Sequence, residues 1–152
     1  MAACVACTSS LIYLEVHEKR GRKAIDHIGI LPERKGTALH DRYTSYDQYE
    51  DVQHAFCNAH HLRDLKFIQE RYQQSWAFDM ENLLLEIKKV VIEAQPAADG
   101  LSAQQIADFE ARYDAVVTAG LQANALLKPA LPLPKKRGKL KQHPAKNLLD
   151  HF

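Results

Sequence analysis

The chain has 152 residues, of which 46% are hydrophobic and 26% charged, so it can fold around a core and is too apolar to be disordered throughout. Lys and Arg number 20 and Asp and Glu 19, and a net charge of +1 does not by itself indicate nucleic acid, a membrane or an acidic ligand. Three cysteines argue against a secreted disulfide scaffold, and no apolar run reaches the roughly 20 residues of a membrane span. We therefore expect a cytoplasmic protein without membrane association.

The chain begins with a predicted β-hairpin. Residues 2–8 and 11–16 are apolar and rich in β-branched side chains, and a short polar link separates them. A helix is predicted over residues 21–28, because its apolar side chains share one helical face. Gly29 can end this helix in the left-handed conformation, and Pro32 prevents its continuation.

Two short strands are predicted next, over residues 37–41 and 52–56. Asp41 stands at the end of the first of them. A carboxylate at that place is held by a rigid element and can project into a cleft as a metal ligand. The alternative interpretation is that Asp41 caps the turn after the strand, and from composition alone that interpretation is favoured.

Residues 58–120 are expected to form a helical region, because apolar residues recur there at spacings of three and four. Ser75 is a candidate cap at the start of the second helix of this region. Ser102 and Gln105 form a capping-box pattern that opens a third helix, and Gly120 is expected to end it.

Residues 121–146 are expected to form a flexible linker rich in proline and basic side chains, and residues 147–152 the first turns of a truncated helix. The linker could contact DNA phosphates, or it could simply be a solvated connection, and the two interpretations are equally supported. Candidate DNA-binding residues are Lys135, Lys136, Arg137, Lys139 and Lys141.

Cys57 and His60 form a second candidate site. With Cys4 and Cys7 they have the residue types of a zinc site, but an odd spacing within one strand points Cys4 and Cys7 to opposite faces. A nucleophilic Cys57 with His60 as base is also conceivable, although no orienting residue is identifiable. The structural alternatives are a small buried thiol and a hydrogen-bonding histidine at a helix start.

Three sequence motifs occur in order: Ile-Gly-Ile-Leu-Pro at 28–32, Gly-Thr-Ala-Leu-His-Asp-Arg-Tyr-Thr-Ser-Tyr at 36–46, and Cys-Asn-Ala-His-His-Leu-Arg-Asp-Leu at 57–65. They closely resemble the transposases of the insertion-sequence-66 type. The likeness continues through further short matches as far as residue 150 and so covers nearly the whole chain.

This resemblance implies a ribonuclease H-like catalytic domain, in which three acidic residues bind two divalent metal ions. Asp41 matches the second acid, and Cys57 and His60 match a Cys-x-x-His pattern that follows it in related transposases. The family often has glycine where this chain has Arg42. The expected fold class is therefore α/β: a partial ribonuclease H-like mixed sheet over residues 1–57, a helical insertion and the basic linker.

The resemblance also places the first acid before Met1 and the third beyond Phe152, so we expect a fragment that is inactive alone. The intact parent would use Mg²⁺ or Mn²⁺, with none bound stably here. Expected partners are DNA and an intact transposase in the bacterial cytoplasm. The alternative function is a non-catalytic DNA-binding or protein-interaction module, and a small zinc protein is a third interpretation.

Overall fold

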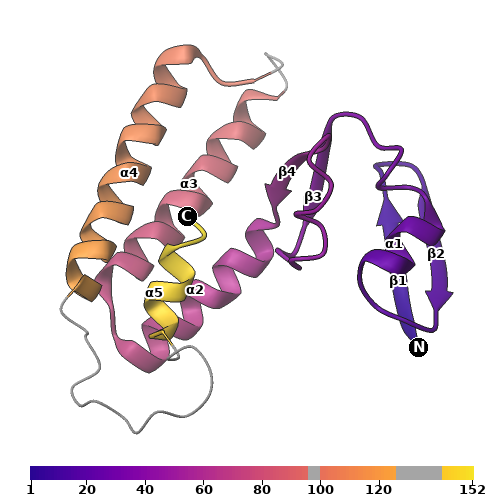
Figure 1. Ribbon diagram of the computed structural model, residues 1–152. Coiled ribbons are helices and arrows are strands. Elements are labelled where there is room, and N and C mark those ends of the chain that lie inside the picture. The colour runs from indigo at the N-terminus through magenta and orange to yellow at the C-terminus, as the bar shows by residue number, and fades with distance from the viewer. Residues whose placement is uncertain (96–99, 126–141) are drawn as a thin grey trace, which may run out of the picture. The chain divides into compact units, whose positions relative to one another are not determined.

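The computed structural model describes residues 1–95, 100–125 and 142–152 (Figure 1). These residues form a mixed α/β structure with two small sheets and five helices. The elements in chain order are β1 (Ala2–Cys7), β2 (Ile12–His17), α1 (Arg22–Ile28), β3 (Thr37–His40), β4 (Gln53–Phe56), α2 (Asn58–Tyr72), α3 (Ser75–Ala94), α4 (Ala103–Ala125) and α5 (Pro144–Leu149). The chain divides into two compact units, residues 1–60 and residues 61–152.

The predicted hairpin is confirmed. Strands β1 and β2 pair antiparallel, with Ala2 opposite His17 and Cys7 opposite Ile12. The turn between them is held by Thr8, whose backbone N–H donates to the carbonyl oxygen of Leu11 at 2.8 Å and whose hydroxyl accepts from the N–H of Leu11 at 3.0 Å. A polar turn therefore connects the two apolar strands.

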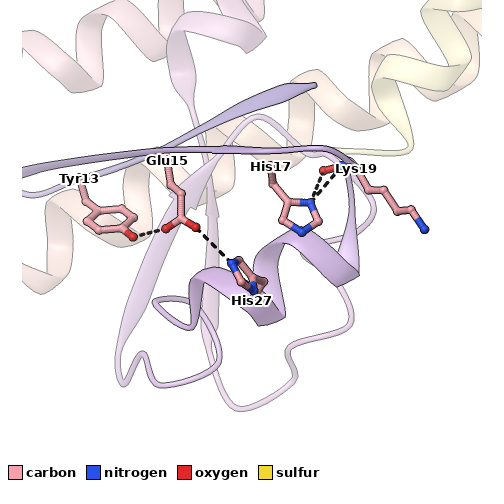
Figure 2. A network of polar contacts seen from close by, with 5 residues as sticks. All are labelled: Tyr13, Glu15, His17, Lys19 and His27. Carbon is pink, nitrogen blue, oxygen red and sulfur yellow. Dashed lines mark hydrogen bonds and ion pairs between the residues drawn. The ribbon is translucent and has the colours of Figure 1, made fainter.

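Helix α1 also lies where the sequence predicts it. Gly29 follows it with a φ of 75° and donates its N–H to the carbonyl oxygen of Ile25 at 3.0 Å, which is the left-handed termination expected. Figure 2 shows the carboxylate of Glu15, on β2, between the Tyr13 hydroxyl and the ring of His27 on α1. The Glu15 oxygen and His27 Nε2 are 3.5 Å apart, so polar contacts join the hairpin to α1.

The sheet itself differs from the expectation. The family resemblance implies one mixed sheet, but the described residues form two separate two-stranded sheets, β1 with β2 and β3 with β4. The second pair is parallel, with Thr37 opposite Gln53 and His40 opposite Phe56. Local patterns predict a strand but not its neighbour, because pairing depends on the segments that reach each strand's edge.

The helical unit is built around one apolar core. Its buried members are Leu65, Ile68, Trp76, Ala77, Met80, Leu83, Ala145, Leu148 and Leu149. They come from α2, α3 and α5, and partly buried residues of α4 pack against them. Helices α3 and α4 run side by side, with α5 against them (Figure 1).

The ends of the helices confirm one predicted cap and correct two other expectations. Ser102 and Gln105 exchange the hydrogen bonds of a capping box, N–H to hydroxyl at 3.2 Å and N–H to amide oxygen at 3.0 Å. Ser75 is not the N-cap of α3, because it is the first residue of the helix and Gln74 occupies the N-cap position. Gly120 does not end α4, which continues to Ala125.

Gly120 is instead a contact point inside the core. A Cβ atom at this position would lie 2.6 Å from Leu149 Cδ2 and 3.0 Å from the ring of Trp76. Its missing side chain therefore lets α5 and α3 approach α4 closely. This explains a glycine in mid-helix without any chain termination.

Helix α5 begins at Pro144, three residues earlier than the truncated helix predicted from residue 147. His143 precedes it, and its ring nitrogen Nδ1 accepts from the N–H of Ala145 at 3.3 Å. Proline is favoured at the first helical position, because it has no backbone N–H that would be left without an acceptor there. The helix then buries Ala145, Leu148 and Leu149 in the core.

Candidate functional site

Asp41 immediately follows β3 and lines a cavity of the N-terminal unit. The cavity has a volume of about 590 Å³, and residues 1–5 of the β1 region form one of its sides. Asp41, Tyr43 and Tyr46 contribute from the segment after β3. Asp41 is exposed, so its carboxylate is accessible to solvent on the border of a concave surface.

The same carboxylate also takes part in the turn. The backbone N–H of Tyr43 donates to Asp41 Oδ1 at 3.2 Å. Between them, Arg42 has a φ of 65°, a left-handed conformation that residues other than glycine rarely adopt. Asp41 therefore supports the turn after β3 through one of its two oxygens, as the turn-capping interpretation expects.

Aromatic and basic side chains surround the cavity. The guanidinium of Arg20 lies over the ring of Tyr43, 4.3 Å from its centre. Burial raises the pKa of Tyr46, and the negative charge of Asp41 raises it further. The hydroxyl of Tyr46 is therefore protonated at neutral pH and is available as a hydrogen-bond donor or acceptor.

The ring of His40, the last residue of β3, packs against the rings of three other side chains. Its ring centre is 4.8 Å from that of Tyr46, 5.0 Å from that of His54 and 5.5 Å from that of Phe56. Burial lowers the pKa of His40, as does the neighbouring His54, while Asp47 and Asp41 act in the opposite direction. The neutral form of His40 is favoured beside the turn that carries Asp41.

Cys57 and His60 lie at the junction between β4 and α2. The N–H of Cys57 donates to the carbonyl oxygen of His40 at 2.9 Å, and the N–H of His60 donates to the carbonyl oxygen of Cys57 at 2.9 Å. The pair is thus connected by its backbone. His60 Nδ1 is buried without a hydrogen-bond partner, and Cys57 is a partly buried free thiol.

The structure does not assemble the zinc site considered above. Within the described ranges, no group of three or more His, Cys, Asp or Glu side chains is placed to hold a metal ion. Cys4 is partly buried and Cys7 exposed, as their odd spacing along β1 predicts. Asp41 is likewise not part of a complete metal site among these residues.

The predicted DNA-binding residues Lys135, Lys136, Arg137, Lys139 and Lys141 lie outside the described residues. In the part of the chain that is described, no helix has both the length and the apolar character required to cross a membrane.

Other cavity residues were not singled out from the sequence. Glu18 and Arg20 line the cavity, and both come from the segment that joins β2 to α1. Nothing in their local pattern marks them, because a charged turn after a strand is common. Tyr43 and Tyr46 could have been found, since they stand in the motif that contains Asp41.

Comparison with known families agrees with the motifs. The family model described as transposase IS66 family matches residues 3–150, which is nearly the whole chain. Neither the curated proteins nor the solved structures contain a match to the chain. The chain therefore belongs to the IS66 family of transposases.

Proposed function

We propose that this chain contributes part of the catalytic domain of a DNA transposase, and that Asp41 is one ligand of its divalent metal ions. The position of Asp41 supports this most directly. It is an exposed carboxylate that follows a strand and lines a cavity, in a chain that belongs to a transposase family. A rigid strand before a carboxylate fixes its position, which a metal site requires.

Asp41 can supply one of the carboxylate ligands that such a metal site needs. Mg²⁺ and Mn²⁺ prefer oxygen ligands, and a carboxylate meets this preference. Metal-dependent cleavage of phosphodiesters uses two ions about 3.5 to 4 Å apart, which stabilise the attacking and leaving oxygens. One aspartate cannot hold two ions, so the remaining carboxylates are proposed to come from outside the described residues. We further propose that the chain is inactive alone.

The cavity also supports a ribonuclease H-like sheet. Consecutive side chains of a strand point to opposite faces of the sheet. Four consecutive residues, Ala2 to Val5, can therefore line the same cavity only if it lies along the edge of β1. In the described residues that edge has no partner strand, because β1 pairs only with β2. We infer that a further strand fits along β1 beside Asp41 and extends the sheet, by pairing with these free backbone groups.

Binding of Mn²⁺ to the isotope-labelled chain tests the role of Asp41. Paramagnetic broadening should be strongest at the backbone amides of Arg42 and Tyr43 and should disappear in Asp41→Ala. Asp51→Ala removes another exposed carboxylate of the same unit and should leave the broadening unchanged. Equal loss in both variants, or no loss in Asp41→Ala, would contradict the assignment.

A cleavage assay tests the proposal of inactivity. The purified chain is incubated with Mn²⁺ and end-labelled DNA, and no cleavage above background is expected. Robust cleavage that is lost in Asp41→Ala would show that the chain holds a complete site.

DNA contact by the basic segment is a second candidate function. Residues 128–146 contain seven basic residues and no acidic one, a composition that binds phosphates without reading sequence. Replacement of Lys135, Lys136 and Arg137 by alanine should weaken DNA binding and make the affinity less dependent on salt, by about three units of slope for three lost phosphate contacts. An unchanged slope would exclude this function.

A further inference from the structure

Two histidines form a row of hydrogen bonds beside Asp41. His40 Nε2 and His54 Nδ1 lie 2.9 Å apart and join β3 to β4. The backbone N–H of Arg42 donates to His40 Nδ1 at 3.2 Å. At the other end, His54 Nε2 lies 3.0 Å from the carbonyl oxygen of Tyr49. The row therefore connects the turn after β3 with the segment before β4.

The two ends of this row determine where its protons lie. The N–H of Arg42 can only donate, so His40 Nδ1 accepts and the proton of a neutral His40 ring is on Nε2. The carbonyl of Tyr49 can only accept, so His54 Nε2 carries the proton and Nδ1 is free to accept. His40 Nε2–H then donates to His54 Nδ1. In this arrangement all four ring nitrogens have a hydrogen-bond partner.

We propose that His40 and His54 are positioning residues that hold the turn on which Asp41 is presented, an inference that rests on the metal-binding role proposed for Asp41. Arg42 is in the left-handed conformation, which is strained for a residue other than glycine and persists only where surrounding contacts fix it. His40 supplies one such contact by accepting from the N–H of Arg42. Asp41 therefore needs only one oxygen for the next N–H, that of Tyr43.

The far end of the row is itself anchored. The hydroxyl of Tyr49 donates to Asp26 Oδ1 on α1 at 2.6 Å, and Arg22 on the same helix donates to Gln48 Oε1 at 3.2 Å. The carbonyl group that accepts from His54 thus belongs to a segment fastened to α1 by two contacts. His54 connects this fixed segment to His40.

Nuclear magnetic resonance of the ¹⁵N-labelled full chain tests the proton assignment directly. Correlation of ring nitrogens with ring carbon-bound protons should identify Nε2 as the protonated nitrogen of both His40 and His54. A scalar coupling should be detectable between His40 Nε2 and His54 Nδ1 across their hydrogen bond. An Nδ1-protonated ring at either position would overturn the inference, and this measurement needs no substitution.

The positioning role is tested with Mn²⁺ as probe. His54→Leu removes the two ring nitrogens that bond to His40 and to the carbonyl oxygen of Tyr49. The Mn²⁺ concentration needed to broaden the amide of Tyr43 should then rise about tenfold, as is typical when a group that orients a metal ligand is lost. His54→Gln retains an acceptor and a donor and should recover most of this loss. His17→Gln changes another histidine of the same unit, whose ring is hydrogen-bonded to Lys19 and lies beside the His27 ring, and should have no effect.

The outcomes separate the two proposals. Unchanged broadening in His54→Leu, with loss of broadening in Asp41→Ala, would overturn the positioning role and leave the proposed function intact. Correct ring protonation with no effect of Asp41→Ala would reject the metal-binding role, and the positioning role with it. Equal effects of His54→Leu and His54→Gln would also contradict the inference, because rescue by hydrogen bonding would be missing.

Discussion

The two units of this chain bury their apolar residues very differently. In the helical unit, Leu65 and Met80 are fully buried within one core shared by several helices. In the N-terminal unit, apolar residues of β2 remain exposed, Ile12 at 80% and Leu14 at 64% of the residue surface. A sheet with one uncovered apolar face is a typical interaction surface. The less completely packed unit is thus the one that carries Asp41.

The largest expected effect on stability comes from a buried residue of the helical unit, compared with an exposed residue of the N-terminal unit. Leu65→Ala should destabilise the chain by about 3 kcal/mol, because it leaves a cavity in the helical core. Leu14→Ala is the matched change on the exposed face of β2 and should alter the free energy of unfolding by no more than about 0.5 kcal/mol. Denaturant unfolding measures both, and similar losses would show that the face of β2 is covered.

Gly120→Ala should cost the next largest amount. The added Cβ would lie 2.6 Å from Leu149 Cδ2 and 3.0 Å from the ring of Trp76, so these side chains have to shift, and overpacking of this kind costs about 1 to 2 kcal/mol. Gly100→Ala adds the same atom where no atom of the described residues lies within 4 Å, and should be nearly neutral. Thermal unfolding of the two variants provides the comparison. A stabilising Gly120→Ala would mean that helix propensity outweighs the contact.

Tyr49 provides a pH test of the N-terminal unit. Burial raises its pKa to about 12, and the hydrogen bond to Asp26 contributes to this rise. Because the folded pKa lies above the ordinary value of 10.0, the associated stability is complete below pH 10 and is lost as pH rises toward 12. Asp26→Asn should lower the pKa toward 10, measured by ultraviolet titration of the tyrosines. Asp108→Asn, in the helical unit, should leave it unchanged.

The smallest effects are expected at two strained residues, one near each end of the segment from β3 to α3. Arg42 and Gln73 have φ values of 65° and 50°. Glycine adopts this conformation without steric cost, so Arg42→Gly and Gln73→Gly should each stabilise the chain by less than about 1 kcal/mol. A clear loss of stability in Arg42→Gly would show that contacts of the arginine side chain outweigh the strain.

Local chemistry explains why so many elements could be predicted. The hairpin, the ending of α1 at Gly29 and the capping box of Ser102 each depend on residues within a few positions of one another. The local pattern predicts a helix end at Gly120, but glycine serves both as a helix stop and as a point of close contact. Its contacts, Trp76 and Leu149, are far away in the sequence.

The candidate site divides in the same way. Asp41, Cys57 and His60 could be named from the sequence, because motif and strand end coincide there. The role of His54 could not, since its hydrogen bond to His40 exists only after β3 and β4 pair in one particular register. Glu18 and Arg20 join the cavity for a similar reason, through the return of the chain after β2.

The order of strands and helices follows from the sequence alone, because periodicity, caps and turn residues act over a few positions. The sequence also determines the family, through motifs spread over nearly the whole chain. The division of the strands into two sheets, the continuation of α4 past Gly120 and the hydrogen bond between two histidines beside Asp41 become visible only in the folded chain. These features depend on contacts between distant segments, whose geometry no local pattern contains.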